Sequence, residues 1–192
     1  LIHALASIDL KAEQTISGTG INLLADGITI FACQILFSSD RSKEFRVGML
    51  ADSLGFYPTF YIAIAVVLLS WFMLYKTPFG MHLRACGEHP AAADSVGINV
   101  RRTRYIGVLI SGLLGGLAGG CIVFTQTIQF TSNLINGRGF IALAAVAFGR
   151  WTPWGVTGAA LLFGAAQALS VLSTNFAALK AFPSEVFNIL PY

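Results

Sequence analysis

The stretch YIGVLISGLLGGLAGGCIVFT, residues 105–125, contains no Asp, Glu, Lys or Arg. Charge-free runs also cover residues 57–75 and 151–179, and residues 16–39 carry only Asp26. A helix rises about 1.5 Å per residue, so residues 57–75 would span about 29 Å, close to the roughly 30 Å of a bilayer core. These stretches therefore predict helices that cross a membrane.

Few residues of the whole chain are charged. Of its 192 residues, 12 are Lys or Arg and 9 are Asp or Glu, so 11% are charged, against roughly 25% in a soluble domain. Hydrophobic residues make up 55%, and the mean hydropathy is +0.72. This composition excludes a soluble, disordered or collagen-like chain, and a net charge of +3 is too small for a nucleic-acid binder. We predict an all-α integral membrane protein, a polytopic bundle of transmembrane helices.

Two charged loops separate the apolar stretches and indicate their orientation. Residues 40–52 hold three Lys or Arg and residues 76–104 hold five. The positive-inside rule therefore places the second loop in the cytoplasm and the first outside. The alternation predicts about five membrane segments, at residues 17–37, 56–75, 105–125, 134–148 and 155–173.

The fourth of these segments is short. At about fifteen residues it fits either a tilted crossing or a re-entrant half-helix. A crossing would place Arg150 in the cytoplasm, so we expect a crossing. Trp151 and Trp154, which flank Pro153, are typical of an interfacial aromatic belt at a turn, with Arg150 as its anchor.

The two ends suggest an internal piece of a longer membrane protein. The sequence opens on Leu1 rather than Met, without a basic leader or a cleavage site, and it closes on FPSEVFNILPY. Its final Pro-Tyr pair resembles the entry to another helix. We expect further helices on both sides.

The cysteines and histidines show no pattern for metal or redox chemistry. Cys33, Cys86 and Cys121 are widely spaced, and the three histidines form no ligand motif. Buried structural thiols are the expected role. The chain also lacks a nucleophile elbow, a His-Glu-x-x-His motif and a Walker loop, so ATP would have to bind to another subunit.

The charged loop 76–104 contains the signals of a short helix. Pro90, followed by three alanines, favours a helix start, and Gly97 favours a left-handed helix stop. About two turns are too short to be stable alone, so a partner or the flanking helices must hold them. An exposed alanine row would let another surface approach closely, and Glu88 would suit the positive end of the helix. A plain connecting loop is the alternative.

The residues of this loop resemble the coupling segment of ABC-importer permeases of the sugar and nucleoside, or ribose-permease-like, family. Those permeases carry Gly-Glu-x-Pro-x-Ala-Ala-x-x-x-Gly-Ile, and this chain has GEHPAAADSVGI at residues 87–98. Further stretches match in order: LKAEQTISGTGINLLADGIT, TPFGMHLRACG, NVRRTRYIGVLISGLLGGLAGG and GRGFIALAAVAFGRWTPWGVTGAALLFGAAQAL. The chain looks most similar to the smaller permease of nucleoside (guanosine-type) importers, without that family's first and last helices.

The resemblance implies a membrane subunit that works with three partners. These are a second permease, ABC ATPase subunits that bind ATP and Mg, and an extracytoplasmic substrate-binding protein. It implies no cofactor on this chain, no metal, no catalytic residue, and a multi-pass location in the bacterial cytoplasmic membrane, in contact with lipid. By this analogy the coupling residues, which would seat in a groove of the ATPase, are Gly87, Glu88, Pro90, Ala91, Ala92, Gly97 and Ile98.

Residues 111–120 carry two parallel rows of small side chains. Small residues let helices approach closely in lipid, so we expect packing within the subunit or against the second permease rather than contact with the substrate. One row is Ser111, Gly115 and Gly119, and the other is Gly112, Gly116 and Gly120.

Polar side chains in the apolar segments suggest a substrate path. Asn22 and Asp26 are four residues apart and share one helix face, where they would serve either a cavity or a structural contact between helices. Amides and aromatic rings at and beyond the outer end of the segment 105–125 suit a nucleobase or a polyhydroxylated solute, but they equally suit an interfacial loop. These further candidates are Gln126, Gln129, Asn133, Asn136, Phe124, Phe130 and Phe140, with Gln167 as a weaker one.

These observations favour the permease of an ATP-driven importer of nucleosides or a related small solute, working by alternating access and without bond chemistry of its own. The alternatives are a permease for ribose-like sugars or riboflavin, an intramembrane enzyme, and a passive channel. The enzyme would need a catalytic constellation, but Asp26 has no His or second acid in its own helix. The coupling loop argues against the channel.

Overall fold

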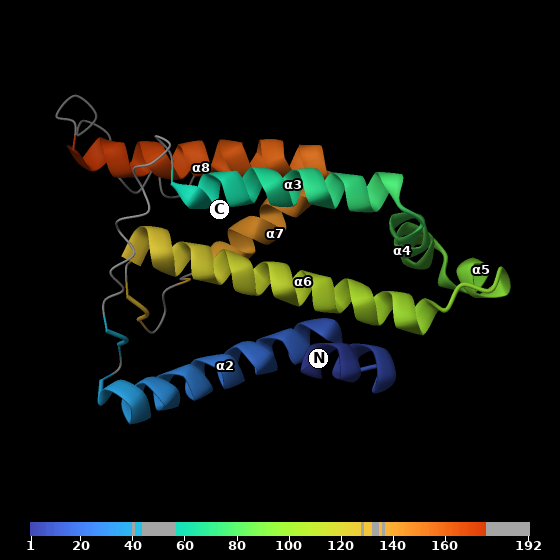
Figure 1. The fold of residues 1–192 in the computed structure, drawn as a ribbon, viewed down its shortest axis with the longest axis horizontal. Coiled ribbons are helices and arrows are strands. Elements are labelled where there is room, and N and C mark those ends of the chain that lie inside the picture. The colour runs from blue at the N-terminus through green and yellow to red at the C-terminus, as the bar shows by residue number, and fades with distance from the viewer. Residues whose placement is uncertain (40, 44–56, 128, 132–134, 136, 176–192) are drawn as a thin grey trace. The chain divides into compact units, whose positions relative to one another are not determined.

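The computed structural model describes residues 1–39, 41–43, 57–127, 129–131, 135 and 137–175, which fold into two units, Leu1–Leu134 and Ile135–Tyr192 (Figure 1). Within the described residues the regular structure is helical, with one isolated β-bridge between Arg41 and Thr131 and no strand. The chain is therefore an all-α protein, as predicted.

The first unit contains eight of the described helices. They are α1 (Ile2–Ala4), η1 (Leu5–Asp9), α2 (Gln14–Phe37), α3 (Pro58–Lys76), α4 (Pro78–Glu88), α5 (Pro90–Ser95), α6 (Val100–Ile122) and η3 (Val123–Thr127). The elements η1 and η3 are single turns of π-helix.

Three helices of this unit are long and apolar enough to cross a membrane. They cover Gln14–Phe37, Pro58–Lys76 and Val100–Thr125. Almost none of their residues is buried inside the chain, so their apolar side chains suit lipid or other membrane helices. The integral membrane character predicted from composition is confirmed, whereas a total of five crossings stays a prediction.

The charged loop between the second and third of these helices is mostly helical. Only α5 was predicted there, but α4 precedes it, and α6 begins at Val100 rather than at residue 105. The charges of Arg101, Arg102 and Arg104 marked where the apolar stretch ends, not where the helix begins. A helix can extend beyond the bilayer, so the end of an apolar stretch does not mark the end of the helix.

The second unit is a hairpin of α7 (Arg138–Phe148) and α8 (Pro153–Asn175). The turn is tight because Gly149 and Gly155 meet backbone to backbone, and Arg150 and Trp151 have positive φ angles of 51° and 59°. A perpendicular ring contact between Phe148 and Phe163 joins the two helices.

The length of α7 bears on the short segment at residues 134–148. Its 11 helical residues extend about 16 Å, roughly half of a bilayer core. The length of the described helix alone therefore does not decide between the crossing that we expected and a re-entrant half-helix, and the crossing stays a prediction. Trp151 and Trp154 lie at the turn and are exposed, as an interfacial pair requires.

The cysteines in the described residues are free thiols. Cys33 and Cys86 are buried and Cys121 is partly buried, which agrees with a structural role. Cys86 is only 1% exposed and lies on the buried face of α4.

Candidate functional site

The segment predicted to couple to a partner is held at its first corner by Thr77. The Thr77 hydroxyl accepts a hydrogen bond from the Gly80 backbone N–H at 3.2 Å, and Pro78 occupies the first helical position. These are ordinary helix-start signals. A Cβ atom on Gly80 would collide with the carbonyl oxygens of Met73 and Leu74, so α4 turns sharply against the end of α3.

A second corner separates α4 from α5 at His89 and Pro90. Proline excludes the preceding residue from the helical region, and His89 accordingly has φ −143° and ψ 80°. The backbone N–H of His89 still bonds to the Ala85 carbonyl at 3.0 Å, and that of Ala93 bonds to the His89 carbonyl at 3.0 Å. The break therefore changes the helix direction while these two backbone hydrogen bonds are kept on either side of it.

The six residues of α5 end in a Schellman motif. The Ile98 N–H donates to the Ala93 carbonyl at 3.1 Å, and the Gly97 N–H donates to the Asp94 carbonyl at 2.9 Å. Gly97 has a φ of +84°, which side chains with a Cβ adopt only at a cost. The helix thus begins at Pro90 and stops before Gly97, as those two residues predicted.

The exposed face of α5 is formed by small side chains. Ala91 and Ala92 are exposed, whereas Ala93 is only 3% exposed and holds the helix against the rest of the unit. Val96, at the end of the helix, is 74% exposed. The sequence carries no signal for Val96, because an apolar residue in a loop is unremarkable until its exposure beside the alanines is known.

Glu88 lies beside the start of α5, as expected, but it also ends the preceding helix. It is the last residue of α4 as well as the residue before the His89 cap of α5. The negative end of the α4 dipole offsets the positive end of α5 at this position. The α4 dipole therefore offsets the favourable interaction that was expected between the Glu88 carboxylate and the α5 dipole. Gly87 beside it is exposed and has open space around its Cα.

The exit from the segment is capped by Asn99. Its Oδ1 accepts a hydrogen bond from the Arg102 backbone N–H at 2.9 Å, and Thr103, which is buried, bonds back to the Asn99 carbonyl. Farther along α6, Gly107 allows close contact with the Leu83 side chain of α4. The elements α4, α5 and α6 thus form one packed corner that carries the exposed face of α5.

We expect Asn99→Ala to destabilise this corner by about 1 kcal/mol, because it removes the acceptor for an unpaired helical N–H. Asn99→Asp keeps an acceptor and should melt like the wild type. The measurement is the melting temperature of the full-length subunit in detergent. An unchanged melting temperature for Asn99→Ala would contradict the role of the cap.

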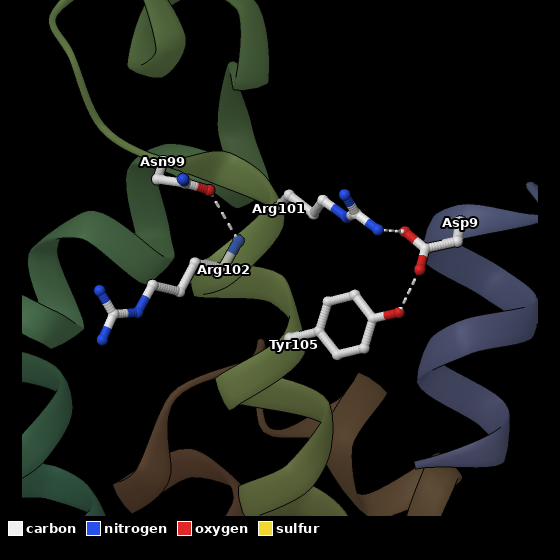
Figure 2. Close-up of polar contacts among 5 residues, drawn as sticks. All are labelled: Asp9, Asn99, Arg101, Arg102 and Tyr105. Carbon is white, nitrogen blue, oxygen red and sulfur yellow. Dashed lines mark hydrogen bonds and ion pairs between the residues drawn. The ribbon is translucent and has the colours of Figure 1, made fainter.

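A polar contact joins the start of α6 to the N-terminal elements. An Nη atom of Arg101 lies 2.7 Å from Oδ1 of Asp9, and the Tyr105 hydroxyl donates to Oδ2 of Asp9 at 2.5 Å (Figure 2). Hydrogen bonding from Arg101, and then from Tyr105, lowers the pKa of Asp9. A lowered pKa means that the contact is fully formed above the ordinary pKa of aspartate and is lost as pH falls through the lowered value. The carboxylate is thus ionised at neutral pH.

The substrate-path candidates are divided between the two units. Asn22 and Asp26 lie one turn apart on the exposed surface of α2, and within the described residues neither side chain has a hydrogen-bond partner. Gln129 follows η3 and is partly buried, whereas the side chain of Gln126 lies outside the described residues, as do Asn133 and Asn136. Phe140 on α7 and Gln167 on α8 are exposed and belong to the second unit.

The small-residue rows of α6 are open. A Cβ atom on Gly112, Gly115, Gly116, Gly119 or Gly120 would meet no described atom within 4 Å, and Ser111 is exposed. One row lines an apolar groove of about 770 Å³. Within the described part of the first unit no other helix therefore approaches these glycines closely. Packing elsewhere in the subunit or against a second permease stays a prediction.

Comparison with protein families matches residues 1–192 to the family described as Branched-chain amino acid transport system / permease component. The chain is similar to the guanosine ABC transporter permease protein NupQ of Bacillus subtilis, at 45% identity, and to the nucleoside ABC transporter permease protein NupC of Lactococcus lactis, at 37%. Both matches cover 100% of this chain and 65% of the relative, so the chain spans less than two thirds of their length.

A third relative carries a different substrate in its name. The chain is 33% identical to the putative glucose ABC transporter permease protein TsgC13 of Haloferax volcanii, over 91% of this chain and 57% of that protein. No solved structure matches the chain.

Proposed function

Because the chain belongs to the Branched-chain amino acid transport system / permease component family, we propose that it is part of the permease subunit of an ATP-driven nucleoside importer. The named relatives at 45% and 37% identity support this role. The observation that carries it is the short helix α5, which is held between two corners and presents Ala91 and Ala92 outward. This geometry suits a part that a partner moves as a rigid body.

The proposed partners supply the functions that this chain would not carry itself. An ABC ATPase subunit binds ATP and Mg and seats α5 in a groove. A second permease covers the glycine rows of α6, a substrate-binding protein delivers the solute from outside, and lipid surrounds the apolar helices. The subunit resides in the bacterial cytoplasmic membrane, with α5 on the cytoplasmic side according to the positive-inside rule.

Transport in this proposal is alternating access between two helix arrangements. ATP binding closes the ATPase subunits and displaces α5. Because α4, α5 and α6 pack as one corner, that displacement tilts α3 and α6. Interfaces that have two packed arrangements convert small displacements into a switch. In this cycle the chain provides the moving helices and their contacts, and no covalent bond is made or broken on it.

The substrate path in this proposal is lined by uncharged polar groups with one acid. Asn22 and Asp26 stand on the same face of α2, and polar groups inside a membrane segment face a cavity or a partner rather than lipid. In the same unit, an amide such as Gln129 matches the hydrogen-bonding edges of a nucleobase. Gln167 and Phe140 belong to the second unit and are separate candidates, an amide for a base edge and a ring for a base face.

Uptake by the full-length importer, reconstituted in vesicles with all its subunits, tests the proposed function. We expect labelled guanosine to enter only with ATP, to be competed by other nucleosides, and to stop with vanadate. Uptake that persists without ATP or with vanadate would indicate a passive channel. Competition by glucose, ribose or riboflavin but not by nucleosides would contradict the nucleoside assignment while leaving the ATP-driven permease intact.

A further inference from the structure

The helices α2 and α6 are joined at both of their ends. At the end near α5, the N-terminal elements α1 and η1 contact both helices, with the Asp9 contacts on the α6 side. On the α2 side, Nδ1 of His3 lies 3.0 Å from the Ser17 hydroxyl. Figure 1 shows these first elements beside the starts of α2 and α6.

The opposite ends of the two helices are joined by Ser42, just after α2, and Phe130, just after η3. The Ser42 N–H donates to the Phe130 carbonyl at 3.0 Å, and the Phe130 N–H donates to the Ser42 hydroxyl at 2.8 Å. The α2 and α6 helices therefore run in the same direction, with a polar link at each end. A pair tied in this way tends to move together, since tilting one helix alone would break a link.

The local backbone geometry directs the Asp9 carboxylate toward α6. The single π-helical turn η1 places Asp9 at its last position, and Lys11 then adopts a left-handed φ of 51° before α2 begins. A left-handed conformation is unfavourable for a residue with a Cβ atom. The turn lets the chain enter α2 while the Asp9 carboxylate remains directed at Arg101 and Tyr105, as Figure 2 shows.

We propose that Asp9 is a positioning residue that ties α2 to the start of α6, so that displacement of α5 reaches the helix that carries Asn22 and Asp26. This inference rests on the proposed transport function and adds to it the route by which the coupling helix acts on the candidate substrate path. Arg101 is only six residues beyond the end of α5 at Ser95, and both oxygens of the Asp9 carboxylate are engaged.

The neighbouring arginine supplies a matched control. Arg102 carries the same charge one residue later, but Figure 2 shows its side chain directed away from Asp9, and it contributes its backbone N–H to the Asn99 cap. Arg101→Ala and Arg102→Ala therefore remove the same charge from the same helix turn, and only the first removes the contact with Asp9.

The first test compares uptake with ATP hydrolysis in the reconstituted full-length importer. We expect Asp9→Asn and Arg101→Ala to lower uptake about three- to tenfold, the scale of a partly exposed ion pair with an added hydrogen bond. ATP hydrolysis should change less than about twofold, because α5 still reaches the ATPase. Arg102→Ala should match the wild type in both. Equal loss of uptake and hydrolysis, or wild-type uptake by Asp9→Asn, would overturn the proposal.

A charge exchange tests whether the pair itself matters. The double variant Asp9→Arg with Arg101→Asp restores an ion pair of opposite polarity, so it should recover most of the uptake that Asp9→Arg alone loses. No recovery in the double variant would overturn the proposal, since two independent structural defects would add rather than compensate.

A distance measurement decides the inference even if the importer carries some other solute. Spin labels on Ala12→Cys and Arg104→Cys, with Cys121→Ala to remove the most accessible native thiol, report the separation of the starts of α2 and α6. We expect a narrow distance distribution that broadens with Asp9→Asn and does not broaden with Arg102→Ala. An unchanged distribution in Asp9→Asn overturns the tie, whatever the uptake assay shows, whereas a failure of nucleoside uptake with a broadened distribution refutes the substrate alone.

Discussion

Replacing Gly97 with proline is expected to abolish transport by the assembled importer. Gly97 has a φ of +84° and donates its N–H to the Asp94 carbonyl. Proline fixes φ near −65° and has no N–H, so the Schellman motif that ends α5 cannot form. A penalty of about 3 kcal/mol corresponds to at least about a hundredfold fewer correctly formed α5 helices. ATP-driven uptake in vesicles should accordingly fall to about 1% or less.

Three comparisons make this result specific. Gly97→Ala keeps the N–H and pays only the left-handed backbone cost, so it should retain a measurable fraction of the uptake. Ala92→Trp leaves the backbone intact but fills the exposed face of α5, and it should abolish uptake and retention of the ATPase subunit. Gly164→Ala, on α8 with open space around it, should leave uptake unchanged. In every variant the binding protein should still take up its substrate, and normal uptake by Gly97→Pro would refute the assignment of α5.

Replacing Gly80 with alanine is expected to cause the largest loss of stability. The added methyl group would collide with the backbone carbonyl oxygens of Met73 and Leu74, which cannot move away as a flexible side chain can. Overpacking of this kind costs about 1–3 kcal/mol. The α3–α4 corner would open, and α5 would be displaced with it. Thermal melting of the full-length subunit in detergent measures the loss.

Gly87→Ala is the matched control, because Gly87 belongs to the same helix and a Cβ there meets no described atom within 4 Å. Alanine has the higher helix propensity by about 1 kcal/mol, so this variant should melt at the same temperature as the wild type or slightly above it. Equal melting temperatures for Gly80→Ala and Gly87→Ala would show that the close approach of α3 and α4 is not needed.

The two corners of the coupling segment show which local signals a sequence carries. Pro90 and Gly97 act through their own backbone restrictions, so the bounds of α5 followed from them. The same kind of signal is present at Thr77 and Pro78, and at Asn99, but the charges around these residues predict a loop where the structure has helix. Capping residues would have located α4 and the true start of α6, because capping depends on neighbours within four residues.

The sequence by itself determined the all-α membrane character of this chain and the position of α5. Both depend on local quantities, the apolar length of a helix and the conformations open to proline and glycine. Only the tertiary structure decided that Gly80 meets α3, that Val96 is exposed beside Ala92, and that Asp9 contacts Arg101 and Tyr105. These contacts join residues that are far apart along the chain or depend on how helices pack, and no spacing within one segment encodes them.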